Sequence, residues 1–343
     1  MSRYLADQNK VVHLFESGTY AGSISALGVG ANTWLGEIQS FSIDQTENYL
    51  EDRYLGASSR NVQDFQQGPL DIAGTITSNI QDVNLLAHAL GSTYEVVATN
   101  TRTTTATEFD SDACQNVFIS GTGKEMTTPY SFTIEDSKQT PGTGANFIRT
   151  VRGCVVDTAT LTLAQGEKTS IEIGFMAQQI DHSSGTTTTI GSNILRPYLW
   201  SDSTLTLAGS TISTAKEISL EITNNLEAPH YLNGSRAIGQ PFLGNRNYTL
   251  NVTMDADFPI QHRLYRTFFA GGSVFNAELD LDHDVTAVGS AHATIYMSGC
   301  IIATMDNPSE VEGINETTLE IRPKTCNLIS YDSKDYAGSA NPY

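Results

Sequence analysis

The sequence has few basic residues and no long apolar run. Its 343 residues include 19 Lys and Arg against 38 Asp and Glu, which gives a formal net charge of -19. Binding nucleic acid by phosphate neutralisation needs clustered bases, so this charge argues against that function, and a negative surface would repel DNA. Solubility or adaptation to high salt explains the charge equally well. No stretch approaches the roughly 20 apolar residues that span a bilayer, and no basic segment precedes an apolar run at Met1. We therefore expect a soluble protein without a signal peptide.

Motifs for catalysis and metal binding are also missing. The sequence contains no GxSxG or HExxH string, and its GxG strings lack the flanking strand and helix that a nucleotide site requires. Asp280 and Asp282 alternate with leucines, which favours the solvated face of a strand over a cation site. We expect no enzymatic activity, no cofactor and no metal. The cysteines have no CxxC spacing, so buried free thiols are favoured over disulfides; the four are Cys114, Cys154, Cys300 and Cys326.

The most informative feature of the sequence is an internal duplication. Arg60 and Gly68 recur as Arg236 and Gly244, each before an alternating strand pattern and a short helical segment. Further on, the string 153–156 (GCVV) is echoed by 299–302 (GCII). A period of roughly 150–180 residues predicts tandem domains and not a solenoid, whose repeats are far shorter. We place a first domain at 1–190 and a second at 191–343.

Most of each copy predicts β-strands. Leu70–Thr77 and Tyr248–Met254 alternate apolar and polar residues with period two, which is typical of half-buried antiparallel strands. The segments around Phe41–Ile43 and Ile218–Ile222 do the same, and 157–175 predicts a hairpin that turns at Gly166. One helix is expected in each copy. Asp82 caps the first before Gly91 ends it, and Asp257 caps the second before Gly271. The chain is therefore predicted to be mainly β, within the α+β class.

The remaining segments are polar. Asn48–Gly68 and Asn225–Gly244 are predicted as long loops between the first two strands of each copy, and long ordered loops are often functional, although a disordered loop is an equally good interpretation. Asp181–Ser192 is predicted as the interdomain linker, Thr99–Gly144 as an insert in the first copy, and the chain from Tyr331 as an arm or frayed end.

The order of strand, long loop, strand and helix resembles that of the major tail tube proteins of phages and archaeal viruses that carry two tube domains in one chain. The strings that carry the resemblance are Ser42–Asn48, Gly68–Ile76 and Leu220–Leu226, followed by Arg236 and Gly244. The resemblance covers about Trp34 to Ser330. It implies two β-sandwich or half-barrel domains, each with one flanking helix, whose strands join edge to edge into a closed barrel.

The resemblance also implies how the protein works. Six domains, and hence three chains, form a pseudo-hexameric ring, and rings stack into a hollow tube that conducts viral DNA during genome ejection. The expected partners are other copies of the chain, the terminator or adaptor, the baseplate or tip, and the tape measure; DNA passes without specific binding and the chain inserts into no membrane. The expected place is the virion tail, after assembly in the host cytoplasm. The expected lumen-facing residues are Asp71, Thr75, Thr77, Thr249, Asn251 and Thr253. The expected inter-ring residues are Glu51, Arg53, Arg60, Asp64, His230 and Arg236.

Two other hypotheses remain open at this stage. One is the inner tube of a phage-like injection system. The other is a β-sandwich module of a tail fibre that binds a receptor or glycan, although such modules expose clustered aromatic side chains at loop tips, whereas Tyr and Phe here fall mostly in strand or helix positions. Whether the tail is contractile, which host is infected and in which direction the rings stack are left open by the sequence.

Overall fold

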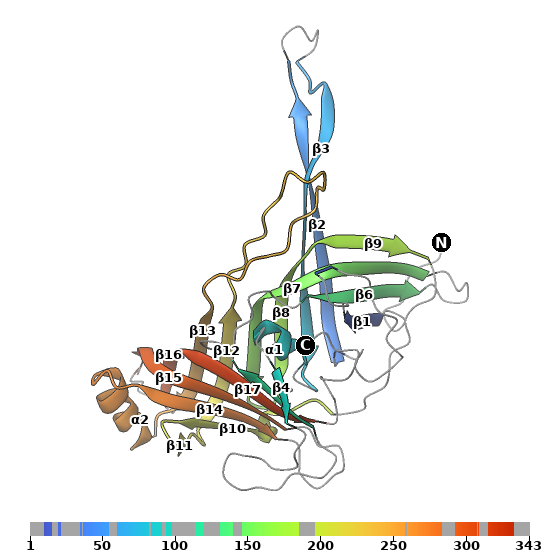
Figure 1. Ribbon diagram of the computed structural model, residues 1–343. Coiled ribbons are helices and arrows are strands. Elements are labelled where there is room, and N and C mark those ends of the chain that lie inside the picture. The colour runs from blue at the N-terminus through green and yellow to red at the C-terminus, as the bar shows by residue number, and fades with distance from the viewer. Residues whose placement is uncertain are drawn as a thin grey trace.

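The computed structural model has an elongated, mainly antiparallel β architecture with a long hairpin that projects from one end (Figure 1). It describes residues 10–15, 20–21, 35, 37–54, 60–81, 84–90, 94–97, 114–119, 131–139, 146–184, 196–257, 259–282, 292–306, 308 and 315–332. The predicted mainly β class is confirmed. Several sequence predictions lie outside the described residues: the Asp82 cap, the Gly91 stop, most of the 99–144 insert and the tail after Asp332.

A central antiparallel sheet runs through both halves of the chain. Its strand order is β2–β3–β8–β7–β12–β13–β16–β15. Alternate residues such as Ile76 and Leu250 are fully buried on one face, as the period-two patterns predict. The strand bounds are β2 Glu37–Asp52, β3 Asp64–Asn79, β7 Asn146–Ala164, β8 Ser170–Ala177, β12 Ala215–Thr223, β13 Asn247–Asp255, β15 His292–Asp306 and β16 Glu316–Arg322.

The long strands β7 and β15 each belong to two sheets. β7 bends at Gly153, and its residues before the bend pair with β6 and β9. β15 bends at Gly299, and its residues before the bend pair with β14 and β17. β1 extends the first of these outer sheets beside β6, and β10 extends the second beside β14. The duplication seen in the sequence is therefore also a duplication of strand pairing. The outer strands are β1 Lys10–Phe15, β6 Phe132–Gln139, β9 Gln179–Ser183, β10 Ser203–Leu207, β14 Phe275–Asp282 and β17 Thr325–Asp332.

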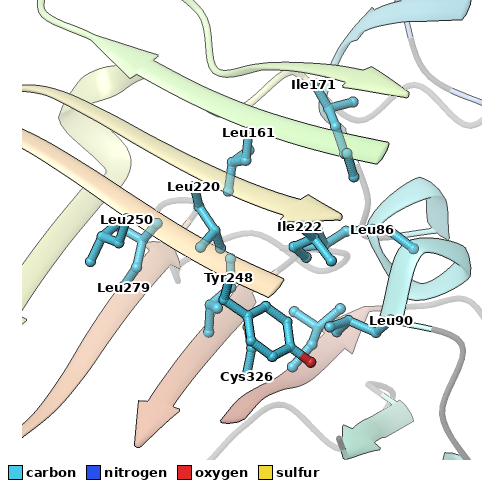
Figure 2. Close-up of a cluster of buried hydrophobic side chains, with 14 of the residues drawn as sticks. Leu86, Leu90, Leu161, Ile171, Leu220, Ile222, Tyr248, Leu250, Leu279 and Cys326 are labelled. Carbon is cyan, nitrogen blue, oxygen red and sulfur yellow. The ribbon is translucent and has the colours of Figure 1, made fainter. Parts of the chain in front are cut away.

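The core lies between the central sheet and the outer elements (Figure 2). Leu161, Leu220 and Leu250 from three central strands are fully buried and belong to one apolar cluster with Leu279 of β14. Helix α1, Asn84–Leu90, contributes side chains to the same cluster. The core is thus continuous across the point where the two halves of the chain meet.

The second helix differs from its sequence prediction. α2, Ile260–Arg263, continues as a π-helix, η4, Leu264–Phe269. Asp257 does not cap it with its side chain: Pro259 occupies the N-cap position without a side-chain bond, and Asp257 contributes its backbone carbonyl to Gln261 N–H. The predicted apolar face is correct, because Leu264 is fully buried and Phe268 packs against the core.

Three segment assignments are corrected. Asn48–Gly68 is not a loop, because β2 reaches Asp52 and β3 starts at Asp64; cross-strand contacts such as Tyr49 against Phe65 replace the expected irregular backbone. Asp181–Ser192 is not wholly a linker, since β9 pairs with β7 through Ser183. The 99–144 segment is not simply an insert: β6 is the first-half counterpart of β14, and β5 pairs with β17. The additional elements are β4 Tyr94–Val97, β5 Cys114–Ile119, β11 Ser210–Thr211 and the 3-10 helix η3 Trp200–Asp202.

Candidate functional site: a polar sheet face and two projecting segments

The face of the central sheet that points away from the core is mostly polar. The predicted lumen residues share it, since they alternate with buried Ile72, Ile76, Leu250 and Val252 along β3 and β13. Ser42 of β2 lies on the same face, where its Oγ is 2.7 Å from Oγ1 of Thr75. We call this surface the polar face. Other hydroxyl side chains occupy the same alternate positions in neighbouring strands: Thr158, Thr160, Thr162, Ser219, Thr304 and Thr318.

The charge of the polar face is strongly acidic. Lys216 contacts Asp255 and Glu316 at 2.6 Å each, and Arg322 contacts Glu320 at 2.8 Å. At the rim of the face, Lys168 contacts Glu37 at 2.6 Å. These three described bases are therefore neutralised by acids of the same face. Several further acids of this face have no basic partner among the described residues: Asp44, Glu172, Glu217, Glu221 and Asp306. The result is a surface with hydroxyl groups and a net negative charge.

Ion pairs at one end of the sheet shift the pKa values of their members. The pKa of Lys216 is raised, first by its hydrogen bond to Asp255 and then by that to Glu316. In the first half of the chain, Lys168 lies 2.6 Å from Glu37 and lowers the pKa of that carboxyl group, with a second hydrogen bond from Asn79. Both groups are therefore charged at neutral pH, as structural ion pairs on a solvated rim are.

The hairpin of β2 and β3 extends well beyond the rest of the sheet (Figure 1). We call residues 49–67 the arm. Its apolar side chains are unusually exposed, with Leu50 at 56% and Phe65 at 59%. The predicted inter-ring residues Glu51, Arg53, Arg60 and Asp64 all lie on the arm, where Arg53 Nη2 contacts Glu51 Oε2 at 2.9 Å. Sequence reasoning missed the exposed aromatic residues of the arm, because alternation alone does not tell which strand positions lack a covering layer.

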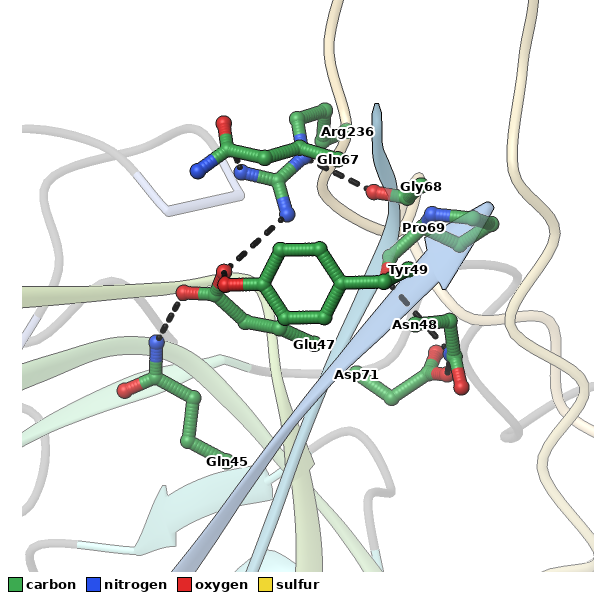
Figure 3. Close-up of polar contacts among 9 residues, drawn as sticks. All are labelled: Gln45, Glu47, Asn48, Tyr49, Gln67, Gly68, Pro69, Asp71 and Arg236. Atoms are coloured by element: carbon green, nitrogen blue, oxygen red, sulfur yellow. Dashed lines mark hydrogen bonds and ion pairs between the residues drawn. The ribbon is translucent and has the colours of Figure 1, made fainter. Parts of the chain in front are cut away.

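The corresponding segment of the second half, 225–246, folds back onto the base of the arm (Figure 3). Arg236 Nε donates to the Gly68 carbonyl at 2.7 Å, and its Nη1 donates to Gln67 Oε1 at 2.9 Å. His230 Nε2 lies 3.0 Å from Asp71 Oδ1. The structure therefore brings the predicted residues His230 and Arg236 into contact with the first half of the chain and not with Glu51, Arg53, Arg60 or Asp64.

A joint between β7 and β12 connects the two halves of the central sheet. Asn224, at the end of β12, is 3% exposed; its Nδ2 donates to the carbonyls of Ala89 and Val156 at 2.9 Å each, and its Oδ1 accepts from Arg246 Nε at 2.7 Å. Helix α1, β7 and β12 thus meet at one amide side chain. Sequence reasoning did not single out Asn224, and its only signal was a polar residue that directly follows an apolar alternation.

A further group of polar residues surrounds a buried histidine of β15. His292 is buried, with Nε2 2.9 Å from Thr294 Oγ1 and Nδ1 3.4 Å from Asp282 Oδ1, while Thr294 donates to Asp280. Asp280 and Asp282 therefore lie beside a buried histidine of the neighbouring strand. Within the described ranges, no group of three or more His, Cys, Asp or Glu residues is placed to hold a metal ion.

A cavity of about 300 Å³ opens at the end of the sheet opposite the arm. Its lining is mostly aliphatic and hydroxyl-bearing, with Trp200 at one side and Lys216 as the charged group.

In the part of the chain that the structure describes, no helix is long and apolar enough to cross a membrane. Cys154, Cys300 and Cys326 are buried free thiols, and the side chain of Cys114 lies outside the described residues.

These features define a class of protein: a β-sheet protein whose most extensive feature is a polar surface continuous across two repeated halves. Comparison with known protein families identifies the family to which the chain belongs. Residues 15–322 match the family of phage tail tube proteins, so the chain belongs to that family and is a structural component of a virion tail. No curated protein matches the chain.

Proposed function

We propose that this protein is the major tail tube subunit, and that its polar face lines a channel through which viral DNA passes into the host. The observation that carries the proposal is the composition of that face: hydroxyl groups and unpaired acids over eight strands, with the described bases Lys168, Lys216 and Arg322 already neutralised. A polyanion is repelled by such a wall and finds no cation to hold it. Asp71, Thr75, Thr77, Thr249, Asn251 and Thr253 are part of this lining in the proposal.

The repeated strand pairing supports a ring of three chains. In the proposal, residues 1–190 and 191–343 are two tube domains, and the joint of β7 with β12 is one of the six joints of a pseudo-hexameric ring. Antiparallel edges that pair around a ring leave no free edge, which is the stable solution for a closed sheet. A ring of this kind is threefold in symmetry and only approximately sixfold, because β4, β5 and the arm have no counterpart among the described residues of the second half.

The arm is proposed to contact the next ring of the stack. Head-to-tail stacking of identical rings gives an open filament, and a projecting segment with exposed Leu50 and Phe65 is suited to bury apolar area against the next copy. Glu51, Arg53, Arg60 and Asp64 then flank this contact. His230 and Arg236 act indirectly, since they hold the 225–246 segment against the base of the arm.

The subunit assembles in the host cytoplasm and joins the terminator or adaptor, the baseplate or tip, and the tape measure. It has no catalytic role and inserts into no membrane. DNA makes only transient contact with it.

Electron microscopy combined with nuclease protection tests the proposal. Purified protein is expected to form rings or hollow tubes that do not retain duplex DNA at physiological salt. The double variant Thr160→Lys/Glu221→Lys places bases on the polar face and should hold DNA in a nuclease-protected state. Glu278→Lys adds a base on the outer sheet, so any DNA it binds should be digested. Protein that stays dispersed at every salt concentration, or wild-type tubes that retain DNA, would overturn the proposal.

A further inference from the structure

The central sheet has an open strand edge at each end within the described residues. β2 pairs with β3 alone, and residues 301–306 of β15 pair with β16 alone. An unpaired edge is a template for another chain. We propose that these two edges pair between neighbouring copies in one defined register, which sets two carboxylates opposite each other and makes closure of the ring dependent on salt. This inference rests on the proposed ring.

The correspondence of β7 with β15 supplies half of the register. Gly153 and Gly299 lie 146 residues apart, both have positive φ, and each is followed by a buried cysteine. Cys154 Sγ lies 3.5 Å from the Val151 carbonyl oxygen, and Cys300 Sγ lies 3.5 Å from the corresponding oxygen, that of Met297. Each strand also shifts register at the same place, just after 156 and 302. The offset of 146 residues therefore applies along the whole edge.

The correspondence of β2 with β12 supplies the other half. A Cβ on Gly68 would lie 2.3 Å from the carbonyl oxygen of Asn48, and a Cβ on Gly244 would lie 2.1 Å from that of Asn225. The two asparagines are 177 residues apart, and the register shifts between Ile38 and Ser40 of β2 and between Ala215 and Glu217 of β12 have the same offset. Asp44 of β2 thus corresponds to Glu221 of β12.

The residue pairs at the in-chain joint of β12 with β7 predict the pairs at the joint between chains. Across the in-chain joint Glu221 lies opposite Thr160, and Thr223 lies opposite Thr158. Applying the two offsets yields the pairs between chains, which are Asp44 opposite Asp306 and Thr46 opposite Thr304 of the neighbouring copy.

Backbone bonding brings these pairs close. Asn224 N–H donates to the Asp157 carbonyl at 2.7 Å, so the positions on either side of it along the strand, including Thr223, are non-hydrogen-bonded pairs. Side chains of such pairs are the nearest across an antiparallel joint, and like charges directly opposite are destabilising. Asp44 and Asp306 therefore repel each other across the joint between chains, where the in-chain joint has Glu221 opposite an uncharged threonine.

The surroundings do not relieve the repulsion. The residue opposite Asp44 on its other side is Ala73, and the residue opposite Asp306 on its other side is Thr318. Arg322 of β16, beside that edge, is bound to Glu320. Screening by salt is then the available means of weakening the repulsion, because the Debye length falls to a few ångströms near molar salt. The joint between chains is thus the weaker of the two joints.

Cysteine crosslinking tests the register. The double variant Thr46→Cys/Thr304→Cys is expected to give covalent three-chain species under oxidation, since Cα atoms of a non-hydrogen-bonded pair lie within disulfide range. Thr158→Cys/Thr223→Cys tests the same geometry inside one chain and should crosslink at monomer mass whether or not rings form. Thr46→Cys/Asp306→Cys is shifted by two residues and should not crosslink, and neither should the single variants. Rings that are visible by microscopy but do not crosslink through Thr46 and Thr304 would overturn the register while leaving the tube function intact.

Assembly against salt tests the carboxylate pair. Asp306→Asn and Asp44→Asn should each strengthen association at the joint about two- to fivefold at low salt, and the double variant should gain little more. Glu278→Gln removes the same charge from the outer sheet and should leave the assembly curve unchanged. If Glu278→Gln and Asp306→Asn shift the assembly curve equally, the effect comes from net charge alone and the proposed pairing is wrong. Failure of wild type and all variants to form rings at any salt would instead sink the proposed function.

Discussion

Gly153 and Gly299 adopt the same left-handed conformation, with φ of 67° and 63°, at the same bend of β7 and β15. Each glycine lies where its strand passes from the central sheet into an outer sheet. Residues with a Cβ are strained in this region by roughly 1–2 kcal/mol. Gly153→Ala and Gly299→Ala should each lower the free energy of unfolding by at least that amount, as measured by denaturant titration.

Gly166→Ala is the matched control for these variants. Gly166 also has positive φ, at 84°, but a Cβ there has no neighbour within 4 Å. A Cβ at Gly153 would lie 3.0 Å from the Cβ of Ala21. Gly166→Ala should therefore report the backbone strain alone and cost less than Gly153→Ala. Equal losses at both positions would show that packing at the bend adds nothing.

Asn224 is predicted to be the most sensitive polar residue of the in-chain joint. Asn224→Ala removes both donors to the carbonyls of Ala89 and Val156, and leaving buried polar groups unpaired costs about 1–3 kcal/mol. Asn224→Asp keeps the size and the acceptor for Arg246 but loses both donors, so it should also destabilise the protein. Asn251→Ala, on the exposed side of β13, should change stability by less than about 0.5 kcal/mol. Thermal unfolding monitored by circular dichroism measures all three.

Period-two alternation predicted β3, β12 and β13 because the pattern is local and one face of each strand is buried. The joint of β7 with β12 was not predictable in this way, since register between strands distant in sequence depends on packing of the whole sheet. The sequence predicts a loop where the arm lies because residues 51–53 are all charged, whereas cross-strand contacts such as Gln66 with Asp52 hold Glu51 and Asp52 in β2. The predicted lumen residues share one face because alternation fixes which side of a strand a residue occupies, but the neutralisation of Lys216 by Asp255 and Glu316 needed the fold.

Arg236 is predicted to anchor the 225–246 segment on the arm. Arg236→Ala removes the bonds to Gly68 and Gln67 but leaves the backbone bond from Leu70 N–H to the Arg236 carbonyl at 2.9 Å. Amide exchange at Leu70 and Gly239 should therefore speed up while the strands of the core stay protected. Arg53→Ala removes an exposed pair with Glu51 and should leave both amides unchanged, because exposed ion pairs contribute little. Unaltered exchange in Arg236→Ala would contradict the anchoring role.

The buried thiols predict a specific response to alkaline pH. Burial raises the pKa of Cys300 to about 11 and that of Cys326 to about 12, from an ordinary value near 9. Because the thiolate is the reactive form, neither cysteine should react with iodoacetamide in the native protein at pH 8, and both should react once the chain is unfolded. The unfolded state loses these protons above about pH 9 while the folded state retains them, so stability should fall as the pH rises from 9 towards 12. Cys300→Ser/Cys326→Ser should flatten that part of the profile, although its stability at pH 8 is lower. Rapid native labelling of either thiol at pH 8 would contradict their burial.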